Sequence, residues 1–386
     1  MKNIFGSIWG KTGFLLLLLV SLSFIIVSCS EFLNEPTVQE DGVIQDEVVL
    51  SKDNPIIRSV ITVQERHTAE LMSLPDVVGT AVGITEDGRP CILVLTKTDI
   101  KAEALAKGQA NPLPDKLERV PVEIMVTGEL KALKGPPGGG GGGVSHTAIQ
   151  TPPIQLGTSG GWRYDLANGY CCGGTLGSLV QKGGQLYILS NYHVLEADIV
   201  SGGNNRTATA GDFVIQPGLI DISCNANNAQ NVATLSGIKS LPGSNVDAAI
   251  AQIISGMVRT DGAILEIGTI SSSITGASLN QAVKKSGRTT GLTRSKISGL
   301  NATVSISYEN ECAGGSAFTK TFTGQIVIAN RASKFLAGGD SGSLMVEDVS
   351  TNPRAVGLLF AGSSSSGIAN PISEVLSVLG ASMVGN

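Results

Sequence analysis

The sequence predicts a mainly β protein in which a small α/β domain, residues 55–133, precedes an all-β domain, residues 144–386. Short apolar runs separated by Gly, Asn and Ser recur along the second segment, as in a β-sandwich or a pair of barrels. No long helical periodicity interrupts these runs before Ile372–Leu379. Residues 134–143 consist mainly of Gly and Pro, which is typical of a flexible linker between domains.

The composition is that of a globular protein. Hydrophobic residues make up 42% of the 386 residues, charged residues make up 15%, and the mean hydropathy is +0.21. The net charge is −5, so no basic field indicates a nucleic-acid partner.

Residues 1–29 are expected to be a targeting segment. Lys2 and Lys11 precede an apolar run at residues 13–27, which is about as long as the core of a signal peptide. A membrane-spanning helix usually needs ~20 apolar residues, so we favour a signal peptide. The run ends in Val-Ser-Cys29, which resembles the lipobox of bacterial lipoproteins. The resemblance implies lipidation of Cys29 and a membrane-anchored lipoprotein of the bacterial cell envelope. An ordinary secretory signal is the alternative.

Residues 30–54 are acidic and polar, and we expect a tether from the membrane to the folded part. The small domain after it is expected to contain two helices and three strands, in the order 61–72, 77–84, 91–96, 101–108 and 120–126.

The Gly run and the cysteines have simple interpretations. A phosphate-binding loop is rejected for residues 134–143, because no GK[ST] motif follows the glycines. No Cys-x-x-Cys pair exists, so no metal site is expected. An exported protein can form a disulfide such as Cys224–Cys312, but the connectivity stays open.

The strongest chemical signal is the Gly-rich turn around Ser341. A serine flanked by Gly339 and Gly342 can expose its hydroxyl while backbone N–H groups point to one spot. The N–H groups of Gly339 and Ser341 are the expected oxyanion hole. A plain polar turn before a strand is the alternative.

A nucleophilic serine needs a base and a carboxylate that orients it. His193 follows an apolar run, and we expect it at a strand end; a structural histidine is the alternative. Asp247 precedes a strongly apolar run, where an unpaired charge is costly and an imidazole is a natural partner. His146 is expected to be inert and outside any apolar setting, and His67 to be a solvated surface residue.

The chain order His193, Asp247, Ser341 is that of chymotrypsin, whereas subtilisins and α/β-hydrolases use other orders. Residues of about 172–374 resemble trypsin/chymotrypsin-like peptidases of the PA clan. The segments that carry the resemblance are Gly173–Leu176, Ser190–His193, Asp247–Ile250, Gly339–Gly342 and Val356–Gly362.

Two further segments, Gly174–Gly177 and Ser286–Gly291, are similar to bacterial members and to the plant NARROW LEAF type with an α/β N-terminal domain. The resemblance implies two six-stranded β-barrels with the triad between them and a polypeptide substrate. It also places Phe335 and Gly362 at an uncharged substrate pocket.

The chain departs from the family at several positions. Val194 follows His193, so the family's disulfide at that place cannot form. No Ile-Val-Gly-Gly start opens the domain, so Asp340 lacks the usual new amino terminus and activation by cleavage is not expected. Phe360 stands where the family has a Ser that bonds the triad Asp, and we expect that hydrogen bond to be missing.

The preferred hypothesis is a serine endopeptidase that needs no metal or organic cofactor. A binding module that keeps the fold without proteolysis is the alternative. A further hypothesis is that residues 55–133 cover the cleft as a prodomain, because a flexible linker gives them that reach.

Overall fold

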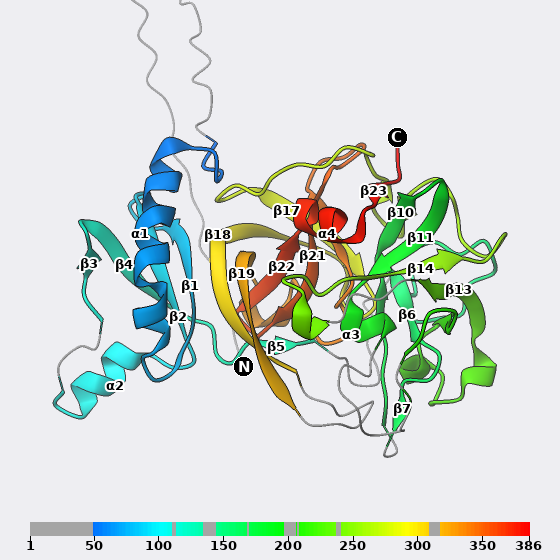
Figure 1. Cartoon of the computed structure of the whole chain (residues 1–386), viewed down its shortest axis with the longest axis horizontal. Helices are drawn as coiled ribbons and strands as arrows, with labels where there is room; N and C mark the ends of the chain where they lie inside the picture. Colours follow the sequence, from blue (N-terminus) through cyan, green and yellow to red (C-terminus); the bar gives the residue numbers. More distant parts are fainter. Residues whose placement is uncertain are drawn as a thin grey trace, which may run out of the picture. The chain divides into compact units, whose positions relative to one another are not determined.

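The computed structural model describes residues 49–109, 113–133, 144–167, 170–196, 206, 208–236, 241–308 and 317–386. Val48–Asn386 form one compact unit (Figure 1). The signal segment 1–29 with Cys29, most of the tether 30–54 and the linker 134–143 lie outside the described residues. In the part of the chain that is described, no helix has the length and apolar character needed to cross a membrane.

The helices are short apart from the first. They are α1 (Pro55–Met72), α2 (Ile100–Ala106), α3 (Tyr192–Leu195) and α4 (Ile372–Leu379), with single 3₁₀ turns at Leu219–Asp221, Ala226–Asn228, Leu241–Gly243 and Arg331–Ser333. Helix α1 begins earlier than the apolar spacing predicts, because Asn54 caps it and Pro55 occupies its first turn. The predicted helix at Ile372–Leu379 is confirmed at the same bounds.

Residues 55–126 of the small α/β segment contain four strands after α1: β1 (Val77–Ile84), β2 (Pro90–Thr96), β3 (Lys116–Leu117) and β4 (Val120–Val126). Strands β1 and β2 form the predicted hairpin, and α1 lies along them (Figure 1). Strand β1 also pairs with β18, through Gly79↔Val304 and Thr80↔Thr303. The α/β segment therefore continues a sheet of the C-terminal segment.

Six strands of the C-terminal segment form a closed circuit of hydrogen-bonded pairs. They are β17 (Ala282–Gly287), β20 (Leu344–Glu347), β21 (Ala355–Gly362), β22 (Ser366–Pro371), β19 (Phe318–Ala329) and β18 (Gly291–Tyr308), and β18 pairs with β17 again. A short strand before the linker, β5 (Lys131–Ala132), pairs with both β18 and β21.

A second sheet has eight strands in an open order. They are β23 (Ser382–Met383), β10 (Ser178–Lys182), β11 (Gln185–Ser190), β14 (Ala249–Ile253), β13 (Gln230–Ser236), β12 (Phe213–Gln216), β6 (Thr158–Trp162) and β9 (Gly174–Leu176). Two small hairpins, β7–β8 (Leu166–Ala167, Tyr170–Cys171) and β15–β16 (Ala263–Ile264, Gly268–Thr269), stand apart from it. The pairing among the described strands thus shows one closed circuit and one open sheet, where two six-stranded barrels were expected.

The cysteines correct one expectation. Cys224 bonds to Cys171 and not to Cys312. Cys172 is also disulfide-bonded, and Cys91 is a free buried thiol.

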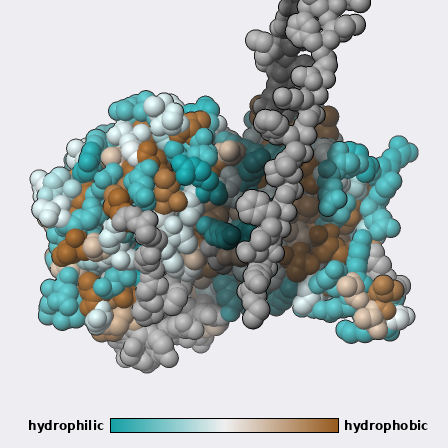
Figure 2. All heavy atoms as spheres, turned by 180° about the vertical axis from the view of Figure 1, so that it is seen from behind, coloured by the Kyte–Doolittle hydropathy of each residue, from teal (hydrophilic) through white to brown (hydrophobic). Residues whose placement is uncertain are grey.

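On the face seen in Figure 2, hydrophobic residues are interspersed with hydrophilic ones.

Candidate active site

His193 and Asp247 form a buried pair. Asp247 lies just before β14, where Asn370 Oδ1 accepts from its backbone N–H at 2.9 Å and Asn191 Nδ2 donates to its carbonyl at 2.7 Å. His193 Nδ1 lies 2.6 Å from Asp247 Oδ2, and the His193 backbone N–H donates to Oδ1 at 3.2 Å. Because the carboxylate accepts, Nδ1 is the ring nitrogen that donates in this pair.

The setting of His193 differs from the expected strand end. Strand β11 ends at Ser190, and His193 lies in the single turn of helix α3. Its side chain is fully buried, so the imidazole is held by packing as well as by Asp247.

Tyr308 is a site residue that the sequence analysis missed. Its hydroxyl donates to Asp247 Oδ2 at 2.8 Å, and its ring lies edge-on to the His193 ring at 6.0 Å. Burial, together with the charge of Asp247, raises the pKa of Tyr308 well above its ordinary value, so the phenol stays a donor. The hydrogen bond expected to be missing because Phe360 replaces Ser is therefore supplied from β18.

Ser341 lies on a turn that needs its glycines. Gly339 and Gly342 have φ of +93° and +92°, in the left-handed region. A Cβ on Gly342 would lie 2.2 Å from Ser190 Oγ. Thr175 secures the turn, since its N–H donates to Ser341 O at 2.8 Å and its hydroxyl donates to Gly339 O at 3.0 Å.

The hydroxyl of Ser341 does not bond to the imidazole. It donates to the carbonyl of Phe360 at 3.1 Å. His193 Nε2 is buried and has no hydrogen-bond partner among the described residues. A Cβ on Gly174 would lie 2.6 Å from Val194 Cγ2 and 3.0 Å from Ser341 O, so only glycine fits between the side chain of Val194 and the backbone of Ser341.

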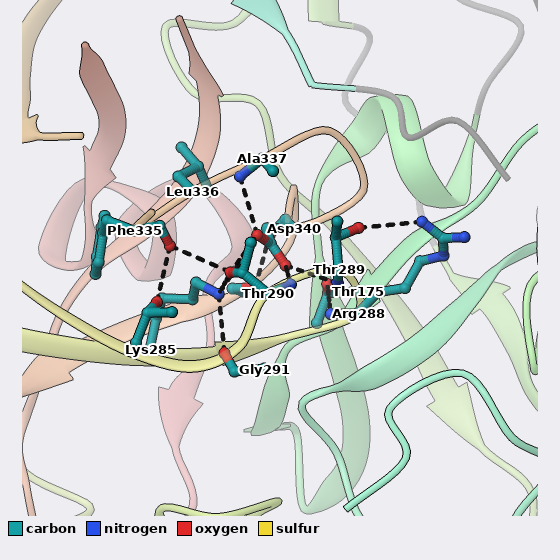
Figure 3. A network of polar contacts seen from close by, with 12 residues as sticks. Thr175, Lys285, Arg288, Thr289, Thr290, Gly291, Phe335, Leu336, Ala337 and Asp340 are labelled. Carbon is teal, nitrogen blue, oxygen red and sulfur yellow. Dashed lines mark hydrogen bonds and ion pairs between the residues drawn. The ribbon is translucent and has the colours of Figure 1, made fainter. Parts of the chain in front are cut away.

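Asp340 is enclosed by donors (Figure 3). Its Oδ1 accepts from the N–H groups of Thr289 and Thr290 at 2.9 and 3.1 Å. Its Oδ2 accepts from the Thr290 hydroxyl at 2.7 Å and the Ala337 N–H at 3.0 Å. Lys285 Nζ lies 3.4 Å from Oδ2, and both side chains are fully buried. Lys285 is therefore the cation that pairs with Asp340.

The segment Ser286–Gly291 is anchored from its other side. Arg288 makes two bonds to Asp221, from Nε at 2.7 Å and from Nη2 at 2.6 Å. Its backbone N–H donates to the hydroxyl of Thr175 at 3.0 Å. This anchor positions the two N–H groups that bind Asp340.

We expect Lys285→Met to lower the free energy of unfolding by about 3–5 kcal/mol, because it leaves a buried carboxylate without its cation. Burial lowers the pKa of Lys285, and Asp340 opposes that shift. Lys284 is the matched control. Its ammonium donates to Val349 O at 2.6 Å, and Lys284→Met should cost about 1 kcal/mol. Urea unfolding measures both changes, and equal losses in the two variants would show that the Asp340 pair is unimportant.

Glu196 follows α3 and is buried. Burial raises its pKa to about 8, against the effect of a hydrogen bond with Tyr192, and the charge of Asp247 adds to the rise. The folded state then keeps a proton that the unfolded state releases above the ordinary pKa of 4.5. The free energy of unfolding should therefore fall as the pH rises from about 4.5 to about 8, by up to about 1.4 kcal/mol per pH unit.

We expect Glu196→Gln to remove this part of the pH dependence, because glutamine does not titrate. Urea unfolding of both proteins across that pH range provides the comparison. A slope in the variant as steep as in the unchanged protein would contradict the assignment.

The predicted oxyanion donor Gly339 is occupied by the chain itself. Its N–H donates to the carbonyl of Leu133 at 2.9 Å. The N–H of Leu133 faces the Phe360 carbonyl at 3.4 Å. The second expected donor, the N–H of Ser341, stays a prediction.

Of the two expected pocket residues, one lines a cavity beside Leu133. This cavity of about 370 Å³ is lined by Gly362 and by Leu336, while Phe335 is not part of its wall. Phe335 is buried in the core, and its carbonyl accepts from the hydroxyl of Thr293 at 2.8 Å.

The other two histidines have structural partners. His146 is buried, contrary to expectation, with Nδ1 2.7 Å from Gly157 O and Nε2 2.6 Å from Glu266 Oε2. His67 lies in α1, and its Nε2 is 3.0 Å from Glu118 Oε1. Neither contacts the His193–Asp247 pair.

Comparison with known proteins gives two kinds of match. A family model described as the Nal1 C-terminal domain matches residues 243–373, which include Asp247 and Ser341. No curated protein matches the chain.

Among solved structures, Thermobifida fusca protease A is 21% identical with a TM-score of 0.38, covering 60% of this chain and 99% of its own. A glutamic-acid-specific serine protease is 20% identical with a TM-score of 0.38, covering 60% and 100%. Cellulomonas bogoriensis chymotrypsin is 19% identical with a TM-score of 0.37, covering 60% and 99%. The chain is thus similar to the Nal1 C-terminal domain over one segment, and the solved structures similar to it are bacterial serine proteases of the chymotrypsin type.

Proposed function

We propose that the protein is a serine endopeptidase that hydrolyses peptide bonds through Ser341. The observation that carries the proposal is the buried pair of His193 and Asp247, 2.6 Å apart, with Nε2 of the imidazole unengaged among the described residues. A serine nucleophile requires a base, and a neutral imidazole whose Nδ1–H donates to a carboxylate is such a base.

In the proposed reaction, the Ser341 hydroxyl rotates from the Phe360 carbonyl toward His193. Its oxygen attacks the peptide carbonyl, and its proton passes to Nε2 and then to the leaving amine. Water then hydrolyses the ester of Ser341 in the same way. The N–H groups of Gly339 and Ser341 stabilise the oxyanion, and Asp247 stabilises the imidazolium.

A binding module that keeps the fold is the second candidate. The observation that favours it is the hydrogen bond from Ser341 Oγ to Phe360 O, which leaves serine and histidine unconnected. Catalytic hydrogen bonds are often formed only when substrate is bound, so we prefer the enzyme.

A fluorophosphonate probe distinguishes the two, because it bonds to an activated serine oxygen and releases fluoride. We expect labelling of the unchanged protein at Ser341 and none in Ser341→Ala. The exposed Ser272 is the control, and Ser272→Ala should label like the unchanged protein. Labelling that persists in Ser341→Ala, or that is absent from every variant, would reject the enzyme.

Three further expectations are kept as proposals: the signal peptide and lipidation at Cys29, attachment to the membrane of a bacterial cell envelope, and an arrangement of the core as two six-stranded barrels. Metabolic labelling with a fatty acid, compared between the unchanged protein and Cys29→Ala, tests the lipidation.

A further inference from the structure

Strand β5 occupies a free part of the edge of β21. Strand β20 pairs with β21 only as far as Leu344↔Leu358, and β22 takes the opposite edge up to Gly362↔Gly367. Beyond Leu358, β5 pairs antiparallel with β21 through Ala361↔Ala132 and Gly362↔Lys131. An extended peptide that binds a protein by adding a strand to a sheet edge makes the same pattern.

The residue after β5 continues into the site. Leu133 presents its carbonyl to the N–H of Gly339 at 2.9 Å, and its N–H faces Phe360 O at 3.4 Å. The hydroxyl of Ser341 donates to the same Phe360 carbonyl at 3.1 Å. The carbonyl of Leu133 therefore lies on the predicted oxyanion donor, and its amide shares an acceptor with the predicted nucleophile.

Leu133 lines a cavity of about 370 Å³. One part of the wall comes from the segment before Ser341, from the end of β21 and from the two residues after β21: Leu336, Ala337, Gly338, Gly362, Ser363 and Ser364. The charged residues of the lining, Glu129 and Lys131, belong to residues 127–133, which we term the inserted segment. An aliphatic residue fits such a wall better than a charged one, which would lose solvation without gaining a partner.

The inserted segment is anchored just before it enters the groove. Leu130 is fully buried, and its carbonyl accepts from the N–H of Ser307 in β18 at 3.0 Å. Further back, strand β4 is paired with β2 in the α/β part. A peptide tethered in this way acts at a high effective concentration, of the order of millimolar for short flexible tethers.

We propose that residues 131–133 are a substrate-like occupant of the groove, carried in the same chain. The groove then binds extended peptides in which a leucine-like residue presents its carbonyl to the N–H of Gly339. A peptide from another molecule must first displace Leu133. This inference rests on the proposed function, because the groove binds substrate only if the protein is a peptidase. It also limits the prodomain hypothesis to the end of the α/β segment, where Thr127–Glu129, Lys131 and Leu133 line the cavity in the described part of the chain.

The first test is peptide binding in the full chain without the nucleophile. We compare Ser341→Ala alone with Ser341→Ala/Leu133→Asp by calorimetry, using acetyl-Leu-Lys-Ala-Leu, the sequence of residues 130–133, as the probe. We expect Leu133→Asp to tighten binding roughly tenfold or more, because the competing segment leaves the groove. Leu105→Asp is the matched control, a leucine 79% exposed in α2, and should leave the affinity unchanged.

Equal affinity in all three proteins would overturn the inference. Should Leu133→Asp fail to fold, Leu133→Gly removes the side chain without adding a charge and must also tighten binding. A second probe, acetyl-Leu-Lys-Ala-Glu, should bind the Leu133 variant at least roughly tenfold more weakly than the first. Equal binding of the two peptides would overturn the preference for a leucine-like residue.

The second test keeps Ser341 and measures the rate of fluorophosphonate labelling. We expect Leu133→Asp to label roughly tenfold faster than the unchanged protein, with Leu105→Asp unchanged. Tighter peptide binding without labelling in any variant would support the occupant and reject the peptidase. If all variants label at the same rate and bind the peptide with the same affinity, the occupant is rejected and the peptidase is supported.

Discussion

Replacing Ser341 with alanine is expected to lower kcat for peptide hydrolysis about 10⁶-fold, the size of the loss when a serine nucleophile is removed. The reason is chemical, because no acyl-enzyme can form and only the backbone donors of the turn remain. A fluorogenic peptide with leucine at the cleaved position measures the change. Leu133→Asp is the better background for the comparison, since its groove is expected to be open.

The variant should fold. The Ser341 hydroxyl makes one hydrogen bond, to Phe360 O, so its loss should cost about 1 kcal/mol of unfolding free energy. Thermal unfolding checks this point, and Ser272→Ala controls for the loss of a serine hydroxyl elsewhere. Hydrolysis by Ser341→Ala at a rate near that of the unchanged protein would remove Ser341 as the nucleophile.

Replacing Asp247 with asparagine is expected to lower kcat about 10⁴-fold, as in the chymotrypsin class. Asp247 Oδ2 accepts from two donors, His193 Nδ1 at 2.6 Å and the Tyr308 hydroxyl at 2.8 Å. An amide nitrogen at that place would face both donors. An amide oxygen there would instead turn the nitrogen toward the His193 backbone N–H, which now donates to Oδ1 at 3.2 Å. The first orientation disfavours the Nδ1–H tautomer, and the second leaves the backbone N–H of His193 without its acceptor. Both remove the charge that stabilises the imidazolium.

Tyr308→Phe separates the two contributions of this site. It removes one hydrogen bond of about 1 kcal/mol but leaves the carboxylate charge, so kcat should fall less than about 10-fold. The bonds from Asn191 and Asn370 to the Asp247 backbone do not depend on either change. Steady-state kinetics measures kcat of both variants. Equal losses of kcat in the two variants, or full activity in Asp247→Asn, would contradict the proposed role of the carboxylate.

Local patterns predicted the strands well. The strands Val77–Ile84 and Val120–Val126 have the bounds that their apolar runs indicate. Alternation and turn residues act over a few positions, so a single sequence carries them. The Gly339 and Gly342 turn was readable for the same reason, because its positive φ values require glycine.

Other features had weaker signals. Lys285 stands in β17 between Lys284 and Ser286, so its sequence setting is only a weak sign of burial, and the structure identifies its buried partner as Asp340. Tyr308 gave no comparable signal, because a tyrosine at the end of a long strand is common. The pairing of Cys224 with Cys171 could not be derived, since disulfide connectivity does not follow from spacing.

The sequence by itself determined several of the strands, the turn that carries Ser341, and that Asp247 needs a partner to be buried. Only the tertiary structure decided which residues are the partners. Asp247 bonds to His193 from a one-turn helix and to Tyr308 from β18, Asp340 pairs with Lys285, and the N–H of Gly339 donates to Leu133. The physical reason is that propensity and turn geometry act along the chain, whereas these contacts join residues far apart in it. Their geometry is set by the packing of whole sheets, which no short stretch of sequence encodes.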